Sequence, residues 1–109
     1  MGINKLDRIK DRFLLLRKES RKGLIPFITA SDPNMDIFDK ILIGLPDAGA
    51  DFIEIGIPFS DPMADGPSIQ ISSRRVLQEQ FEVKKLFNSV LKLRKTDNAT
   101  PVILMGYYN

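Results

Sequence analysis

The sequence has 109 residues, 43% of them hydrophobic and 28% charged, which is enough for one small globular domain with a modest core. Sixteen basic and fourteen acidic side chains give a net charge of +2, a balance that argues against a nucleic-acid or membrane-surface protein. The chain has no Cys and no His, which excludes disulfides, metal sites with His or thiolate ligands, and a Ser–His triad within it. It has no secretory signal and no apolar run near the ~20 residues of a membrane span, so we expect a cytoplasmic protein.

The first predicted element is an amphipathic helix. Leu6, Ile9, Phe13 and Leu16 recur at spacings of three and four, and a polar stretch that ends in glycine follows them as a helix stop. Four basic residues between 17 and 22 have no aromatic residues among them and acids close by. We therefore interpret them as a solvated helix end rather than a phosphate or nucleic-acid patch.

A strand and a helix are predicted next. A short apolar run over 24–30 indicates the strand, although it contains a proline. The Asp-Pro-Asn sequence at 32–34 has cap and turn chemistry and predicts a helix over about 35–48. Pro46 is unfavourable late in this helix, so we expect a kink or an early end there.

The second predicted strand, over 51–56, contains one acid among apolar residues. Because side chains alternate along a strand, Glu54 shares a face with Phe52 and the flanking isoleucines take the other face. We expect the apolar neighbours to desolvate Glu54 partly, a condition that suits a carboxyl to proton transfer. The alternative interpretation is a structural acid paired with a Lys or Arg.

A loop rich in proline and glycine follows this strand and carries a second carboxylate, Asp65, near its far end. A loop carboxylate stays closer to water and remains an acceptor, so Glu54 and Asp65 can divide acid and base roles. The alternative is that Asp65-Gly66 is only a turn, because Asp and Gly are ordinary turn residues.

Helices over about 68–77 and 83–94 and a strand over 101–106 complete the chain. The helix over 83–94 has one predicted apolar face, made of Val83, Leu86, Phe87, Val90 and Leu91. Strands that alternate with helices indicate an α/β fold with a parallel sheet and helical crossovers. A complete (β/α)8 TIM barrel takes about 250 residues and has eight strands, of which this sequence contains about three. We therefore expect residues 1–109 to be a single partial domain, the N-terminal portion of such a barrel. The sequence would then be a piece of a longer protein.

The fourteen residues Ile53–Gly66, Ile-Glu-Ile-Gly-Ile-Pro-Phe-Ser-Asp-Pro-Met-Ala-Asp-Gly, resemble the signature of the tryptophan synthase alpha chain family at every position that can be compared. So long a match of mixed chemistry is very specific. One departure is Ser31, in a loop, where the family more often has Gly. The resemblance covers nearly the whole chain, with the first twenty or so residues the least diagnostic, and extends to residues 26–30, 32–33, 48–51, 67–70 and 105–109.

The resemblance implies a lyase that cleaves indole-3-glycerol phosphate to indole and glyceraldehyde 3-phosphate by a retro-aldol reaction in tryptophan biosynthesis, with no cofactor in this chain. The family's catalytic Glu and Asp fall on Glu54, the proton shuttle, and Asp65, which stabilises the indole N–H. Family positions that contact the substrate fall on Phe27, Met105 and Tyr107, although Phe27 fits core packing as well. The phosphate site of such barrels follows strands seven and eight, outside this sequence.

The resemblance also implies a partner, the tryptophan synthase beta subunit of an α2β2 complex, which carries pyridoxal phosphate. Pro58, Phe59 and Asp61 match the loop that packs on that subunit. Two alternatives remain open. One is another phosphate-binding barrel lyase, which usually has a catalytic Lys at a strand end, and these three strands contain none. The other is a non-catalytic fragment that keeps only the partner-binding loop. We expect no turnover from this 109-residue chain alone.

Overall fold

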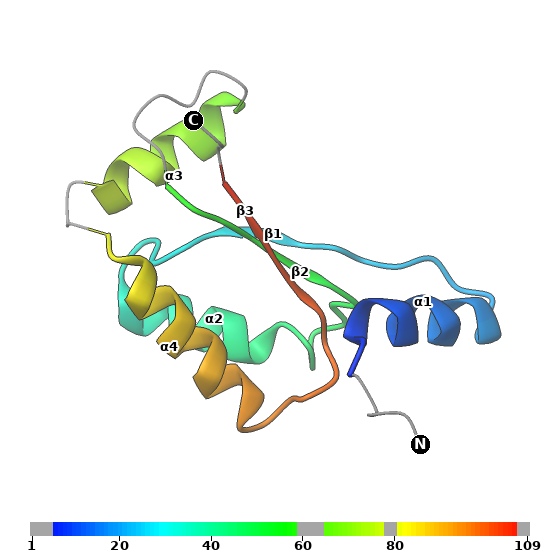
Figure 1. Cartoon of the computed structure of the whole chain (residues 1–109). Helices are drawn as coiled ribbons and strands as arrows, with labels where there is room; N and C mark the ends of the chain where they lie inside the picture. Colours follow the sequence, from blue (N-terminus) through cyan, green and yellow to red (C-terminus); the bar gives the residue numbers. More distant parts are fainter. Residues whose placement is uncertain (1–5, 59–64, 78–80, 107–109) are drawn as a thin grey trace.

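The computed structural model describes residues 6–58, 65–77 and 81–106. The three strands form one parallel sheet in the order β1-β2-β3, with helical segments between consecutive strands (Figure 1). The sheet with helical crossovers predicted from the sequence is therefore confirmed. In chain order the elements are α1 (Arg8–Lys18), β1 (Phe27–Thr29), α2 (Met35–Gly44), β2 (Ile53–Gly56), α3 (Pro67–Leu77), α4 (Val83–Arg94) and β3 (Val102–Met105).

Side-chain caps and a proline set the bounds of the first two helices. Asp7 caps α1 by accepting a hydrogen bond from the Lys10 amide at 3.0 Å, and Asn34 caps α2 by accepting one from the Ile37 amide at 3.0 Å. Helix α2 ends at Gly44, just before Pro46. The early end predicted at this proline is confirmed, and the predicted extension of the helix to residue 48 was wrong.

Strand β1 is shorter than the strand predicted over 24–30, because it begins only at Phe27. The chain just before it still runs beside β2, since the Leu24 carbonyl accepts hydrogen bonds from the amides of Asp51 and Phe52. Pro26 has no amide hydrogen to continue the ladder, which accounts for the late start of regular strand structure. In the sheet register Phe27 pairs with Glu54, which pairs in turn with Ile103.

Helices α2 and α4 cover one face of the sheet, and the core lies between this helical layer and the sheet (Figure 1). Two isoleucines of β2 point into this core, each fully buried. Around them pack the side chains of α2 and α4 that face inward, and the main members are Ile53, Ile55, Phe38, Leu42, Leu86 and Leu93. This layer of helices on a parallel sheet is the arrangement that a crossover unit produces.

Helix α4 packs through a different face from the one predicted. Its buried residues are Leu86, Ser89 and Leu93, whereas Phe87 and Leu91 are exposed. A polar contact accounts for this difference from the predicted face. The Ser89 hydroxyl donates a hydrogen bond to the carboxylate of Asp39 on α2, which turns Ser89 toward α2. The predicted apolar face was therefore only partly right: Leu86 is buried in the core and Val90 packs beside it, while Val83 is exposed like the other two.

The other face of β2 carries Glu54 and Gly56 by the alternation of side chains along the strand, and Phe52 directly precedes the strand. Helix α1 lies near the N-terminal ends of the strands, where the rings of Phe13 and Phe52 have centroids 5.0 Å apart (Figure 1). Helix α3 lies at the opposite, C-terminal ends. Within the described part of the chain, no helix combines the length and apolar character that crossing a bilayer requires.

Candidate active site

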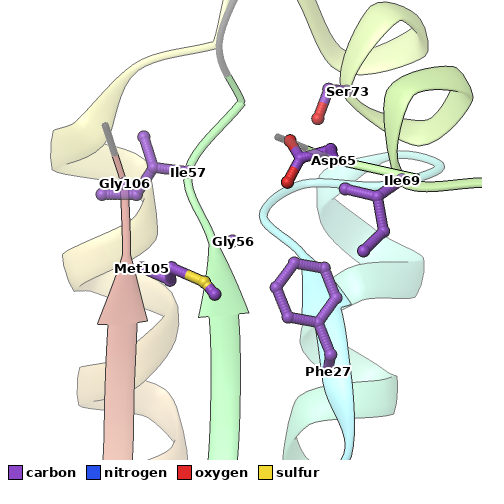
Figure 2. Close-up of a pocket in the computed structure, with 8 residues that line it drawn as sticks. All are labelled: Phe27, Gly56, Ile57, Asp65, Ile69, Ser73, Met105 and Gly106. Atoms are coloured by element: carbon purple, nitrogen blue, oxygen red, sulfur yellow. The ribbon is translucent and has the colours of Figure 1, made fainter. Parts of the chain in front are cut away.

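A cavity of about 230 Å³ lies at the C-terminal ends of the strands (Figure 2). Gly56 and Met105, the last residues of β2 and β3, form part of its wall, and α3 contributes Ile69 and Ser73. Catalytic sites of TIM barrels occupy this end of the strands, which makes the cavity a candidate active site. The full lining is Phe27, Gly56, Ile57, Asp65, Ile69, Ser73, Met105 and Gly106.

Asp65 is the one charged side chain among the cavity-lining residues, and it is half-buried. Figure 2 shows it beside Ile69 and Ser73, above the ring of Phe27 and across the cavity from Met105. Its backbone is held from α3, because the Gln70 side-chain amide donates a hydrogen bond of 2.8 Å to the Asp65 carbonyl. The carboxylate therefore meets a mostly apolar cavity from a fixed point just before α3.

Gly56 leaves the space that the ring of Phe27 occupies. A Cβ atom at this position would lie 2.3 Å from the Phe27 Cζ atom, far inside van der Waals contact. The two residues share one face of the sheet, since Phe27 pairs with Glu54 and Gly56 follows two positions later. Sequence reasoning treated Gly56 only as the end of a strand and missed this role. A glycine at a strand end beside a strand that begins with an aromatic residue was the available signal.

Glu54 lies on the same sheet face as Gly56 and two residues before it in β2. It is therefore farther from the C-terminal end of the strand than the cavity wall. It is half-buried between two apolar neighbours in the register, Phe27 and Ile103, and it is not itself a lining residue. None of the ion pairs in the described part of the chain involves Glu54. That observation gives no support to the alternative of a structural acid paired with a cation.

The structure brings three of the predicted site residues together at the cavity: Phe27, Asp65 and Met105. Pro58 directly follows the cavity residue Ile57 and is buried. The other predicted positions, Phe59, Asp61 and Tyr107, lie outside the described residues. Sequence reasoning did not identify Ile69 and Ser73, because only the docking of α3 against β1 places them in the wall.

A sequence model of a protein family, described as Tryptophan synthase alpha chain, matches residues 13–109. The chain belongs to the tryptophan synthase alpha chain family. The resemblance found in the sequence is thus confirmed over almost the whole chain. The cavity described above lies entirely within the matched residues, so its walls belong to the part of the chain that matches the tryptophan synthase alpha chain family.

Individual relatives agree with this assignment. The tryptophan synthase alpha chain of Dechloromonas aromatica is 52% identical over 104 residues, which are 95% of this chain and 39% of the relative. The solved structure of tryptophan synthase subunit alpha from Legionella pneumophila str. Paris superposes with a TM-score of 0.90 at 44% identity, covering 94% of this chain and 39% of that one. A tryptophan synthase structure from M. tuberculosis has a TM-score of 0.84 at 26% identity, covering 95% and 42%.

The chain spans about two fifths of the length of the tryptophan synthase alpha chains that it matches. Those solved structures are TIM barrels, and the three parallel strands and four helices described here superpose on a part of them. The predicted fold class, α/β with the N-terminal part of a (β/α)8 barrel, is confirmed.

Proposed function

We propose that this chain is the portion of a tryptophan synthase alpha subunit that supplies the acid–base pair for cleavage of indole-3-glycerol phosphate. The single observation that carries the proposal is the location of Asp65, in a mostly apolar cavity at the C-terminal ends of the strands of a tryptophan synthase alpha fold. The enzyme is then a lyase of tryptophan biosynthesis that acts in the cytoplasm. Residues 1–109 form part of its single barrel domain.

The cavity suits a flat aromatic ring. Phe27, Ile57, Ile69 and Met105 offer apolar surface, and Asp65 offers an acceptor for the indole N–H. Cleavage of the bond between the indole ring and the glycerol chain needs a proton on the ring carbon and loss of a proton from the chain hydroxyl, which becomes the aldehyde. We assign both transfers to Glu54, with Asp65 stabilising the positive charge that develops on the indole nitrogen.

Conservative substitutions test these roles in the full-length protein. Glu54→Gln and Asp65→Asn keep size and hydrogen-bonding capacity but remove the ionisable group. Because general acid–base groups typically contribute ~10²- to 10⁴-fold, we expect kcat for indole release to fall at least about a hundredfold in each variant, with an unchanged circular dichroism spectrum. Glu82→Gln is the matched control, an exposed acid at the start of α4 whose side chain makes no capping bond. Near-normal turnover in Glu54→Gln would refute the proposal.

The partner that we propose is a tryptophan synthase beta subunit, which binds pyridoxal phosphate, while the alpha chain needs no cofactor of its own. The loop residues Pro58, Phe59 and Asp61 are the proposed contact, and the loop leads directly to Asp65. Contact with the partner is thereby coupled to the position of the catalytic carboxylate. Asp61→Ala should weaken stimulation of indole release by the beta subunit without removing basal activity. Unchanged stimulation would count against this interface.

The strands disfavour the alternative of another phosphate-binding barrel lyase with a catalytic lysine. The residues of β1, β2 and β3 include no lysine, and the cavity wall includes none among the described residues. Addition of a beta subunit separates the remaining alternatives. If this part of the protein served only to bind the partner, it would still bind the beta subunit. Glu54→Gln would then have no effect on indole release by the full-length protein.

A further inference from the structure

Helix α3 determines where Asp65 lies, because the helix begins two residues after it. The helix docks on β1 at the edge of the sheet, apart from the α2–α4 layer (Figure 1). It also supplies Ile69 and Ser73 to the cavity wall, opposite the contribution of Met105 (Figure 2). The position of α3 on β1 therefore sets the spacing between Asp65 and the ring of Phe27, the first residue of β1.

A buried hydroxyl pair forms the first link between α3 and β1. The Oγ1 atom of Thr29 and the Oγ atom of Ser72 lie 2.6 Å apart, and both residues are buried. Ser72 also donates its proton to the Ile69 carbonyl at 2.9 Å, so the Thr29 hydroxyl is the donor in the pair. This link fixes the middle of α3 to the last residue of β1.

An ion pair with two parallel hydrogen bonds forms the second link. The Arg75 guanidinium donates from Nε to Asp32 Oδ1 and from Nη2 to Asp32 Oδ2, each at 2.9 Å. Asp32 belongs to the turn after β1, where its amide bonds to the Thr29 carbonyl at 3.2 Å. A planar guanidinium that bonds a carboxylate through both oxygens defines orientation as well as distance. The two links together prevent α3 from sliding or rotating on β1.

We propose that Asp32 and Arg75 are a positioning pair, which holds α3 on β1 so that Asp65 faces Phe27 at the spacing that indole-3-glycerol phosphate cleavage requires. The inference rests on the proposed function. The side chains are 16% and 54% exposed, and ion pairs as accessible as this contribute little to global stability. Displacement of a catalytic group by about 1 Å, in contrast, can cost about a hundredfold in rate. The pair therefore acts on catalytic geometry more than on folding.

The test measures indole release by the full-length protein with its beta subunit. We expect Arg75→Ala and Asp32→Asn each to lower kcat by about ten- to a hundredfold with an unfolding midpoint close to that of the unsubstituted protein. Arg75→Lys keeps the charge but cannot make both bonds, so its loss should be smaller. Arg74→Ala is the matched control, the neighbouring exposed arginine of the same helix, which forms no ion pair within the described part of the chain. It should retain kcat within about twofold.

A double-mutant cycle distinguishes positioning from general destabilisation. If Arg75 acts through Asp65, then Arg75→Ala should lower the residual activity of the Asp65→Asn variant by less than about twofold. An equal loss in both backgrounds would overturn the proposal, as would kcat values of Arg75→Ala and Asp32→Asn that match Arg74→Ala. Should Arg75→Ala fail to fold, Asp32→Asn carries the cycle. Full activity of Glu54→Gln and Asp65→Asn would instead refute the proposed function.

Discussion

Gly56 shows how one missing side chain shapes the candidate active site. We predict that Gly56→Ala raises KM for indole-3-glycerol phosphate about tenfold or more, because the new Cβ atom, 2.3 Å from Phe27 Cζ, forces the ring out of its place. The control is Gly44→Ala at the end of α2, where a Cβ atom meets nothing within 4 Å. Steady-state kinetics on both full-length variants check this. Equal KM values would show that the Phe27 ring does not form the substrate surface.

Asp51 is the most constrained acid at the N-terminal ends of the strands. It is 2% exposed, and its carboxylate accepts two hydrogen bonds of 2.9 Å from Arg21 and one of 2.8 Å from the Leu24 amide. The hydrogen bonds from Arg21, aided by the Leu24 amide and the nearby charge of Arg12, hold the pKa of Asp51 below its ordinary value of 3.8 despite burial. The ionised form therefore stabilises the folded state.

The pH dependence of stability follows from this shift. A lowered folded-state pKa contributes stability that is present above the unfolded pKa and is lost as pH falls through the folded pKa. We predict that Asp51→Asn lowers the free energy of unfolding by about 1.5–3 kcal/mol near neutral pH, the usual range for hydrogen bonds to a charged group, because only the carboxylate of this pair is buried and the Arg21 side chain is 44% exposed. The difference from the unsubstituted protein should shrink below about pH 4 in urea titrations. A difference independent of pH would contradict the assignment.

At the scale of single residues, the sequence and its family resemblance predicted three residues that line the cavity, Phe27, Asp65 and Met105, because motif and strand position carry that information. It did not predict the partner of Asp51, since Arg21 and Asp51 are far apart in the chain and only the fold joins them. Ser73 was missed for the same reason. Long-range polar contacts depend on how the helices dock, which local patterns do not encode.

At the scale of elements, a polar contact fixes the docking of α2 against α4. The Asp39 carboxylate accepts hydrogen bonds from the Ser89 hydroxyl and from Lys92 Nζ, the latter at 2.8 Å. The hydrogen bond and charge of Asp39 raise the pKa of Lys92. Ser89 is buried, however, and Lys92 is 55% exposed, so the two contacts differ in energetic weight.

We predict that Ser89→Ala lowers the free energy of unfolding by about 1.5–3 kcal/mol, the usual range for a hydrogen bond to a charged group, because it leaves a buried carboxylate oxygen without its donor. Lys92→Ala should cost clearly less than Ser89→Ala, since the Lys92 ammonium is accessible to water. Urea denaturation of the two variants measures both values. A larger effect for Lys92→Ala would reverse the order and contradict this account of the helix pair.

The ends of the helices were easier to predict from the sequence than the faces through which they pack. Caps and prolines gave the start and end of α2, because these signals act locally. The face on which α4 packs was predicted less well. The buried stripe of Leu86, Ser89 and Leu93 lies to one side of the predicted apolar face, so periodicity alone does not select it. The buried stripe includes a serine, and a serine gives no signal in a hydrophobic pattern.

At the scale of the whole molecule, the parallel direction of the strands followed from the alternation of strands and helices, but closure of the barrel did not. Crossover connections predict a parallel sheet whether it stays open or closes. The expectation of a barrel came from the family signature in Ile53–Gly66, and the solved relatives bear it out. Within the described residues β1 and β3 form the sheet edges, and large apolar side chains on α4 remain exposed, among them Phe87 and Leu91.

Exposed apolar surface and unpaired strand edges make a polypeptide of residues 1–109 prone to associate when it is expressed alone. We predict that it binds a hydrophobic dye, forms concentration-dependent oligomers in sedimentation experiments and releases no indole. Leu91→Lys should reduce the association without loss of helix content, because Leu91 is 63% exposed on α4. Leu93→Lys is the matched contrast, since Leu93 is 0% exposed and a lysine there would place an unpaired charge in the core. A monomeric, dye-free polypeptide would show that the exposed face of α4 does not drive association, and the Leu91→Lys variant would then behave like the unsubstituted one.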